Sequence, residues 1–380
     1  MAFLYGDGIH DDQPAIQELL DSGCCEVALG VPKAHYLLGR TLKIHSFQTL
    51  RLPRYAVIRM ADGANCPMLE NADPLNGNRD FSLIGGIWDY NNRGQAENPI
   101  QVPHPEMPEY TGVMFYFYNV KHLRVADLTC KDPVNFCLTL DRASYFTVEN
   151  LTFDFNHGNP TAVNMDGVHL DGNCHYGLIR NLKGACYDDL VALNADEGSD
   201  GPISHIEVDG IFCEDCHSAA RLLSVKNAVE DIHIHNVHGT FYQYCVGVTK
   251  YYPGKTAGYF DGLVFENIHA SKAMRYSFYQ KDGTFEFPLI WFEKELLIKN
   301  AVIREVYRRE TVSQVPLICV EQDTTVENLC LSNIVQESDG NLRPILMENQ
   351  GHIQALRARG LRSSCGETIS GGGTIGSALE

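Results

Sequence analysis

Acidic side chains gather in one stretch of the sequence, at Asp166, Asp171, Asp188 and Asp189. If these carboxylates lie together on one face of the fold, they repel one another, so the pKa of one rises while another stays ionised. Such a set suits paired acid and base catalysis, and packing alone does not require it. We therefore take Asp166, Asp188 and Asp189 as candidate catalytic residues. Asp171 precedes a glycine and also fits an ordinary turn.

Polar residues beside these aspartates are candidate ligands for a substrate. Asn164 stands two positions before Asp166, and His169 two positions before Asp171. In an extended strand His169 shares a face with Asp171 and not with Asp166, because successive side chains alternate between faces. We include Asn164, His169 and Asp171 as substrate-binding candidates. An ordinary place in the strand alternation explains His169 equally well.

The elements that must position these residues repeat along the chain. A strand-like phrase with an Asn or Asp returns at intervals of about 30 residues, a period typical of solenoids and propellers. Each phrase alternates apolar and polar residues with a period of two, which indicates strands. Two or three short strands per repeat favour a coil of a parallel β-helix over a four-stranded propeller blade. Turn positions or a ladder of stacked amides explain the repeating asparagines. They are Asn150, Asn181, Asn236, Asn267, Asn300 and Asn328.

A solenoid needs covered ends, and the sequence offers one cap. The segment 10–23 predicts a helix with Asp11 or Asp12 as N-cap and Pro14 in its first turn. Its apolar face is formed by Ile16, Leu19 and Leu20, and Gly23 ends it. We predict one all-β domain over 1–365, a parallel β-helix of about ten coils with a cap at about 1–25. Residues 366–380 form a Gly/Ser-rich tail or a last irregular coil.

Composition excludes several classes of protein. The 380 residues are 44% hydrophobic and 21% charged, which is typical of a globular chain. A net charge of -18 argues against an unaided nucleic-acid binder, and no apolar run approaches the ~20 residues that span a bilayer. The start MAFLYGDGIHDD lacks a secretory signal, and the 13 scattered cysteines fit reduced thiols in the cytosol. We expect a cytoplasmic protein, or a secreted one if a signal has been removed.

Signatures of cofactors are also missing from the sequence. It contains neither a GxGxxG nor a Walker A motif, so we expect no organic cofactor. Cys213 and Cys216 form one CxxC, but no second pair of ligands follows at a zinc-like spacing, so we expect no metal. The expected partner is an oligosaccharide, and the oligomeric state cannot be read from the sequence.

Two parts of the chain resemble known families. The segment YGDGIHDDQPAIQELLDSG and the following VPKAHYLLGRTLKI resemble the opening of the pectate-lyase-like superfamily of right-handed, single-stranded β-helices. Residues 80–270 resemble glycoside hydrolase family 28, which contains polygalacturonases. Asn164-Met165-Asp166 resembles the family's Asn-Thr-Asp, and Tyr187-Asp188-Asp189 resembles its Gly-Asp-Asp. The chain looks like a divergent member.

The resemblance implies an inverting glycosidase. It makes Asp189 the general acid that protonates the glycosidic oxygen. Asp166 and Asp188 would hold and deprotonate the attacking water on the opposite face. Inverting enzymes keep their acid and base about 6.5–9.5 Å apart to admit that water.

The same resemblance also implies contacts with the substrate. His217 falls where the family has Gly-His-Gly, and it would tune the acid or contact the sugar. Lys250 falls where the family has Arg-Ile-Lys, but the arginine of that motif is Val248 here. Arg221 is a candidate replacement, although an ion pair to Glu214 or Asp215 explains it equally well. Lys250 and Arg221 together would pair with the carboxylate of a uronic acid, as in pectin fragments.

Long irregular segments add the last candidates for sugar binding. Residues 88–112 and 277–294 carry aromatic side chains that could stack on sugars, although anchoring a loop is the commoner role of such residues. If these segments wall off one end of a cleft, the enzyme is exo-acting on short oligosaccharides. Asn194 and Asp196 border the cleft or form a turn. The aromatic candidates are Trp88, Tyr90, Tyr110, Phe278, Tyr279, Phe287 and Trp291.

Two alternatives stay open at this point. A polysaccharide lyase or uronate epimerase on the same fold would abstract a proton beside a carboxylate, often with a metal that neutralises charge. A non-catalytic carbohydrate-binding β-helix would bind glycan without turnover. The tight aspartate pair one short coil from a third aspartate favours water activation, and so a hydrolase.

Overall fold

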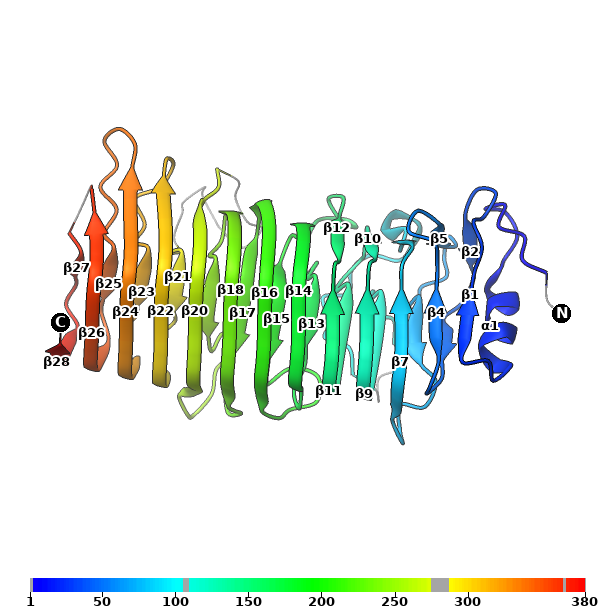
Figure 1. The fold of residues 1–380 in the computed structure, drawn as a ribbon, viewed down its shortest axis with the longest axis horizontal. Coiled ribbons are helices and arrows are strands. Elements are labelled where there is room, and N and C mark those ends of the chain that lie inside the picture. The colour runs from blue at the N-terminus through cyan, green and yellow to red at the C-terminus, as the bar shows by residue number, and fades with distance from the viewer. Residues whose placement is uncertain (1–2, 105–108, 275–286, 365–366, 380) are drawn as a thin grey trace. The chain divides into compact units, whose positions relative to one another are not determined.

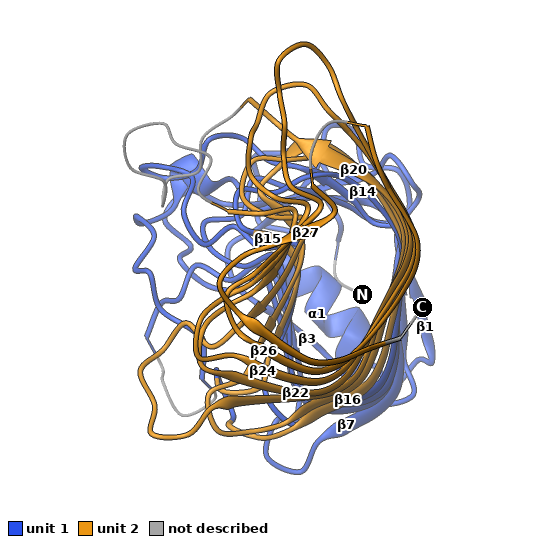
Figure 2. Ribbon diagram, turned by 90° about the vertical axis from the view of Figure 1, so that its left-hand side faces the viewer, with its two compact units in different colours: residues 1–188, 197–199 blue, residues 189–196, 200–380 orange. Residues whose placement is uncertain are grey.

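A computed structural model describes residues 3–104, 109–274, 287–364 and 367–379, and Figure 1 shows its elements in chain order. The chain divides into two compact units, coloured separately in Figure 2. Unit 1 comprises residues 1–188 and 197–199, and unit 2 comprises residues 189–196 and 200–380.

Unit 1 contains one α-helix, one 3₁₀-helix and fourteen strands among its described residues. They are α1 (Gln13–Asp21), β1 (Glu26–Ala28), β2 (Tyr36–Leu38), β3 (Leu42–Ile44), β4 (Thr49–Arg51), β5 (Val57–Met60), β6 (Leu69–Asn71), β7 (Asn78–Ile84), β8 (Ile87–Asp89), η1 (Asn92–Gly94), β9 (Phe115–Ala126), β10 (Thr129–Lys131), β11 (Leu138–Glu149), β12 (Thr152–Asp154), β13 (Val168–Leu170) and β14 (His175–Ala185).

Unit 2 consists of strands and their connections in the part that the structure describes. They are β15 (Asp189–Asn194), β16 (Ile203–Cys216), β17 (Ser218–Leu223), β18 (Val229–Phe241), β19 (Val246–Thr249), β20 (Gly258–Lys272), β21 (Ile290–Phe292), β22 (Leu296–Glu310), β23 (Ile318–Val320), β24 (Thr325–Ser338), β25 (Met347–Asn349), β26 (His352–Ser363), β27 (Ile369–Ser370) and β28 (Thr374–Leu379).

Each unit is a right-handed parallel β-helix, which confirms the predicted fold class. In unit 1, β7, β9, β11 and β14 pair in parallel, each with its equivalent in the next coil. In unit 2 the same holds for β16, β18, β20, β22, β24 and β26. Figure 2 shows the ribbon of unit 2, in orange, turning repeatedly around a common interior.

Equivalent apolar residues of successive coils stack in the interior of each unit. Because side chains alternate along a strand, every second residue of a repeat points inward and meets its counterpart one coil away. Burying each such side chain contributes about 1.5–3 kcal/mol. One fully buried column in unit 1 contains Leu83, Val125, Val148 and Ile179. One in unit 2 contains Ile234, Phe265, Ile303 and Leu331.

The repeating asparagines form turns and amide ladders, as predicted. Asn150, Asn181, Asn236 and Asn267 have positive φ, the left-handed conformation that asparagine tolerates. The Asn181 amide donates to Asn150 Oδ1 at 2.6 Å in unit 1, and the Asn267 amide donates to Asn236 Oδ1 at 2.6 Å in unit 2. The repeat therefore marks coil corners and not a reaction site.

Helix α1 confirms the predicted cap, with Ile16 and Leu20 fully buried on its inner face. Its N-cap is Asp12, whose carboxylate accepts hydrogen bonds from the backbone of Tyr5 and Leu37. At the other end of the chain, β27 and β28 pair with β25 and β26. Every cysteine among the described residues is a free thiol. The helical part of the described chain is too short and too polar to cross a bilayer.

Candidate active site

The three aspartates of the predicted site are all buried. Asp166 belongs to the connection before β13, Asp188 directly precedes β15, and Asp189 is the first residue of β15. Asp188 is 8% exposed, whereas Asp166 is 1% and Asp189 0% exposed. Buried carboxyl groups need charged or polar partners, because burial without them costs several kcal/mol. The contacts of each aspartate therefore define what it can do.

Asp166 is held by a buried histidine in unit 1. Its Oδ2 lies 2.6 Å from Nδ1 of His169 on β13. The other ring nitrogen, Nε2, lies 3.2 Å from Asp171 Oδ1 and 3.3 Å from Glu197 Oε2. Burial alone would lower the pKa of His169, but the charge of Asp171 and the hydrogen bonds that the ring donates to these carboxylates outweigh it and raise that pKa well above its ordinary value.

A second carboxylate layer lies beside His169. Thr139 and Leu140 of β11 pair with His169 and Leu170 of β13, so Asp141 stands one coil from Asp171. Burial and the charge of Asp171 raise the pKa of Asp141 to about 7. Burial also raises the pKa of Asp171 to about 6, although His169 opposes it. Two like charges at such a distance do not both ionise easily.

Asp141 and Glu197 were not among the predicted site residues, although a sequence pattern could have identified Asp141. The phrases Leu-Thr-Leu-Asp at 138–141 and Val-His-Leu-Asp at 168–171 have the same pattern, which places both aspartates at equivalent coil positions. Glu197 carries no comparable signal, because it follows β15 in an irregular connection.

Asp189 is surrounded by donors in unit 2. Its Oδ2 lies 2.9 Å from Nε of Arg221, and its Oδ1 accepts hydrogen bonds from the hydroxyl of Ser218 and from that of Tyr244 at 3.3 Å. His217 Nδ1 lies 4.0 Å from the same oxygen. Parallel pairing of β15 with β17 places Asp189 directly opposite Ser218, and Arg221, which is opposite Ala192, lies close enough along the same pair of strands for its long side chain to meet the carboxylate.

His217 is neutral in this setting. Burial, with the nearby charges of Arg221 and Lys272, lowers the pKa of His217 to about 4, although Asp189 opposes the shift. At 2% exposure it faces Asp189 and not solvent. Of its two predicted roles, tuning a catalytic carboxyl fits this position, and contact with a sugar does not.

Arg221 pairs with Asp189, which is a different carboxylate from the two expected as its structural partners. An ion pair to Glu214 or Asp215 was expected if Arg221 were structural, and a substrate carboxylate if it were functional. Val248 is fully buried in register with Leu222, so an arginine at that position would point into the interior. Arg221 therefore supplies a cation on the outward side of this sheet.

Lys250 contacts protein groups in this structure, which does not favour its predicted contact with a substrate. Its ammonium lies 2.5 Å from Glu295 Oε2 and donates to the carbonyl of Gly254 at 3.1 Å, and only 5% of the residue is exposed. Its backbone N–H also donates to Glu293 Oε2 at 2.7 Å. Because its charge is matched by a protein carboxylate, Lys250 ties neighbouring connections together and is a poor ligand for a uronate.

Other predicted binding residues have structural contacts. His169 and Asp171 are fully buried, and both ring nitrogens of His169 face protein carboxylates, so contact with a sugar is excluded in this conformation. Asn164 is a half-buried residue with φ of 52° in the connection before β13. Asp196 accepts hydrogen bonds from the backbone of Val225 and Lys226, so it forms a turn contact. Asn194 is buried at the end of β15.

The aromatic candidates separate into core and surface residues. Trp88 and Tyr90 are fully buried in unit 1, so stacking on a sugar is excluded for them. Phe278 and Tyr279 lie outside the described residues. Phe287 and Trp291 form a cluster with Tyr244, with ring centroids 4.9–6.1 Å apart. Since Tyr244 donates to Asp189, this aromatic cluster borders the candidate site in unit 2.

A pocket of about 310 Å³ opens on the outward face of unit 1. The outward residues of successive coils follow in the order Lys43, Glu70, Tyr116, Thr139 and His169. The pocket takes in the first three of these and is also lined by Tyr118, His104 and Tyr110. Tyr116 connects it to the acidic cluster, since its hydroxyl lies 3.5 Å from Asp141 Oδ2.

Within single units, two sets of side chains have metal-ligand chemistry. His169, Asp171 and Glu197 are buried in unit 1, and Glu207, His233 and His235 lie nearer the surface of unit 2. In the second set each histidine already contacts a carboxylate, Glu266 at 3.1 Å or Glu207 at 3.0 Å. Neither set is built from the three candidate catalytic aspartates.

Comparison with known proteins assigns the class. The family model of glycosyl hydrolases family 28 matches residues 90–279. A search of curated protein sequences finds no match. A family 28 exopolygalacturonase of Yersinia enterocolitica has a TM-score of 0.65 at 13% identity, over 98% of this chain and 76% of that one. An endo-xylogalacturonan hydrolase of Aspergillus tubingensis has a TM-score of 0.59 at 15% identity, over 98% of both chains.

The same fold also occurs in a protein of another kind. The surface adhesin PfbA of Streptococcus pneumoniae has a TM-score of 0.55 at 17% identity, over 98% of both chains. At such identities the structural likeness defines the fold, a right-handed β-helix. The family match covers half of the chain and includes all three candidate aspartates, which makes this a β-helix of the glycosidase class. The chain belongs to glycosyl hydrolases family 28, as a divergent member.

Proposed function

We propose that the protein is an inverting, exo-acting glycosidase that cleaves a short oligosaccharide. The observation that carries the proposal is the environment of Asp189, which directly follows Asp188 in the chain. Its fully buried carboxylate pairs with Arg221 and accepts hydrogen bonds from Ser218 and Tyr244. Within family 28, such a held carboxylate next to a second acid is suited to water activation.

The contacts favour a different division of roles from the one first expected. A carboxyl group that donates a proton needs surroundings that favour its neutral form, and an arginine partner favours the charged form. Asp189 has that partner at 2.9 Å, and Asp166 has a histidine at 2.6 Å. We therefore assign Asp188, the most exposed of the three, as the general acid. Asp166 and Asp189 then act as the carboxylates that hold and deprotonate water.

The substrate that we propose is a neutral oligosaccharide. The two cations expected to bind a uronate face protein carboxylates instead, Arg221 on Asp189 and Lys250 on Glu295. Acidic groups crowd around the Asp166–His169 pair, at Asp141, Asp171 and Glu197, and this excess of carboxyl groups disfavours an anionic sugar. Aromatic side chains suit the apolar faces of sugar rings. Pectin-derived galacturonides remain the second class to test.

Exo action is supported by how the pocket of unit 1 is bounded. Pro103, His104, Tyr110 and Thr111 line one side of it, and they come from the long segment that the sequence singled out. Tyr116 and Tyr118 offer rings 6.5 Å apart as a surface for one or two sugar residues. A pocket of this size fits the end of a short chain better than the middle of a polymer.

The test is a screen of purified protein against neutral oligosaccharides and galacturonides, following reducing ends and ultraviolet absorbance together. New reducing ends without absorbance support a hydrolase, whereas rising absorbance indicates a lyase. Binding without turnover would identify a carbohydrate-binding protein. Asp339→Asn is a suitable control, because this exposed aspartate pairs with Arg309 on the surface.

Activated substrates separate the roles of Asp188 and Asp189. A dinitrophenyl glycoside has a leaving group that needs no proton, so loss of the general acid matters little for it. We expect Asp188→Asn to lose about 10²–10⁴-fold on a natural oligosaccharide and to recover on the activated one. Asp189→Asn should lose activity on both. Recovery of Asp189→Asn and not of Asp188→Asn would restore the first assignment.

A further inference from the structure

The buried histidine beneath Asp166 has more carboxylate contacts than a neutral imidazole can satisfy. A neutral imidazole carries one N–H, and its second nitrogen is an acceptor. Both nitrogens of His169 face carboxylate oxygens, at 2.6 Å on one side and at 3.2 and 3.3 Å on the other. An ionised carboxylate has only acceptors. Protons on both nitrogens satisfy all three contacts.

The rest of unit 1 holds the ring in this orientation. Phe136 stacks on it with ring centroids 3.9 Å apart and planes 12° from parallel. Strand β13 pairs with β11. Just after β13, the backbone N–H of Gly172 donates to the carbonyl of Glu197 at 3.3 Å, which ties the connection that carries Glu197 to this coil. His169 has no exposed surface. It therefore cannot act by touching a sugar, only through its neighbours.

Gly198 allows the carboxylates to gather there. Its φ is +56°, and a Cβ at this position would lie 2.5 Å from Asp171 Oδ2 and 2.8 Å from Asp141 Oδ2. The next residue, Ser199, donates its backbone N–H to Asp141 Oδ2 at 3.1 Å. The connection thus covers the two carboxylates closely. The titratable groups that contact the histidine in unit 1 include Asp166, Asp171 and Glu197, and Asp141 and Tyr116 lie next to Asp171 in turn.

We propose that His169 is a positioning residue, a permanently charged imidazolium that orients the Asp166 carboxylate and keeps it ionised, with Asp171 and Glu197 holding that charge in place. This inference rests on the proposed function of Asp166 as a carboxylate that binds water. It gives His169 and Asp171 a role beneath the site in place of the substrate contacts first expected. With a neutral histidine, the same geometry would need a proton on Asp171 or Glu197, or a bound cation, because a lone pair would otherwise face two carboxylates.

Nitrogen-15 NMR of histidine-labelled protein tests the charge without any substrate. At about pH 8, above the ordinary titration range of histidine, we expect one residue to show two protonated ring nitrogens. His169→Gln should remove that signal, and His238→Gln, in the half-buried stack with Phe212, should not. A signal of a neutral or metal-bound ring at His169, before or after treatment with a chelator, would overturn the proposal.

Kinetics test the link to Asp166. We expect His169→Gln to lower kcat at least tenfold and to leave KM within about twofold, because the residue touches no substrate. Asp171→Asn keeps the shape of the cluster and should lower the pKa of the His169 imidazolium measured by NMR, so it serves if His169→Gln fails to fold. An imidazolium with unchanged kcat in both variants would overturn the positioning role. Absence of turnover by the wild type would instead refute the proposed function, and NMR would still decide the charge.

Discussion

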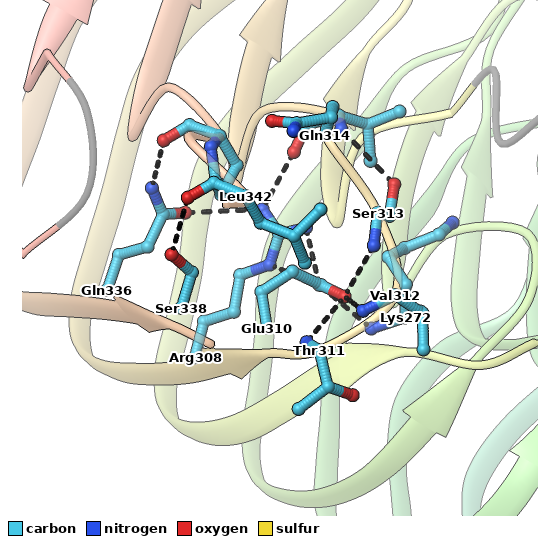
Figure 3. A network of polar contacts seen from close by, with 12 residues as sticks. Lys272, Arg308, Glu310, Thr311, Val312, Ser313, Gln314, Gln336, Ser338 and Leu342 are labelled. Atoms are coloured by element: carbon cyan, nitrogen blue, oxygen red, sulfur yellow. Dashed lines mark hydrogen bonds and ion pairs between the residues drawn. The ribbon is translucent and has the colours of Figure 1, made fainter. Parts of the chain in front are cut away.

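Lys272, the last residue of β20, is a buried cation in unit 2 whose charge we expect to lower stability at neutral pH. Its ammonium donates to the carbonyls of Tyr242 and Gln243, and its backbone N–H donates to Glu310 Oε2 at 3.3 Å. Figure 3 shows it beside Arg308, whose guanidinium lies 2.6 Å from Glu310. The carboxylate of Glu310 thus pairs with the Arg308 guanidinium, whereas the Lys272 ammonium bonds only backbone carbonyls among the contacts of the described residues.

The magnitude follows from the pKa of the lysine. Burial, together with the charge of Arg308, lowers the pKa of Lys272 from 10.5 to about 7. Between these values the unfolded chain binds one more proton than the folded protein, so stability rises with pH. The whole difference corresponds to about 5 kcal/mol, present in full below pH 7 as a destabilisation. About 2 kcal/mol of it is recovered between pH 7 and pH 9.

The perturbation is Lys272→Met, which removes the titrating group from the buried network. We compare the free energy of unfolding of the variant with that of the wild type. The gain in stability from the substitution should be about 2 kcal/mol larger at pH 7 than at pH 9. Lost hydrogen bonds to the two carbonyls add a cost that does not depend on pH. The comparison therefore isolates the charge. Lys255→Met, an exposed lysine of the same unit, is the control and should give no such difference.

The assay is urea denaturation followed by tryptophan fluorescence. The chain has two tryptophans, and Trp291 lies in unit 2, so a Trp88→Phe background reports on the unit that contains Lys272. A difference between variant and wild type that stays within about 0.5 kcal/mol across this pH range would refute the reasoning, because it would mean that Lys272 stays charged or is solvated.

Three further predictions concern the candidate site. Arg221→Met should destabilise the protein by about 3 kcal/mol in guanidinium denaturation, because it leaves Asp189 buried without its cation. Arg221→Lys keeps a cation and should lose less stability. Equal losses of stability in the two variants would count against the ion pair. Gly198→Ala should lower the free energy of unfolding by at least about 2 kcal/mol in the same assay, because of the positive φ and the overlap of the new Cβ with Asp171. A loss below about 0.5 kcal/mol would contradict the close packing of this connection on Asp171. Lys250→Met should change the KM for any galacturonide that is turned over by less than twofold, and a tenfold rise would restore its role as a uronate ligand.

The fold was predictable because its signal is local and repeated. The repeated asparagine marks a coil corner, as at Asn150 and Asn236. The period-two alternation of apolar and polar residues identifies the inner face of each strand without knowledge of its neighbours. The helix at 13–21 followed from Pro14 and one apolar face in the same way. Each of these features is decided within a few residues, so a single sequence is enough.

The partners of the charged residues were not predictable, because they depend on register between coils. Arg221 contacts Asp189 one coil away, and Lys250 contacts Glu295 in a connection far along the chain. A one-residue change in the length of a turn moves every side chain of a strand to the other face. The acidic residues of the site could be found from their clustering, whereas their roles depend on which cation each one meets.

The most direct test of the central claim is the anomeric configuration of the first product. Proton NMR during early turnover of the best oligosaccharide from the screen reads it before mutarotation mixes the anomers. The account predicts a hydrolysed product with inverted configuration and no unsaturated sugar, lost in Asp188→Asn and Asp189→Asn alike. A product with retained configuration, or an unsaturated one, would contradict it.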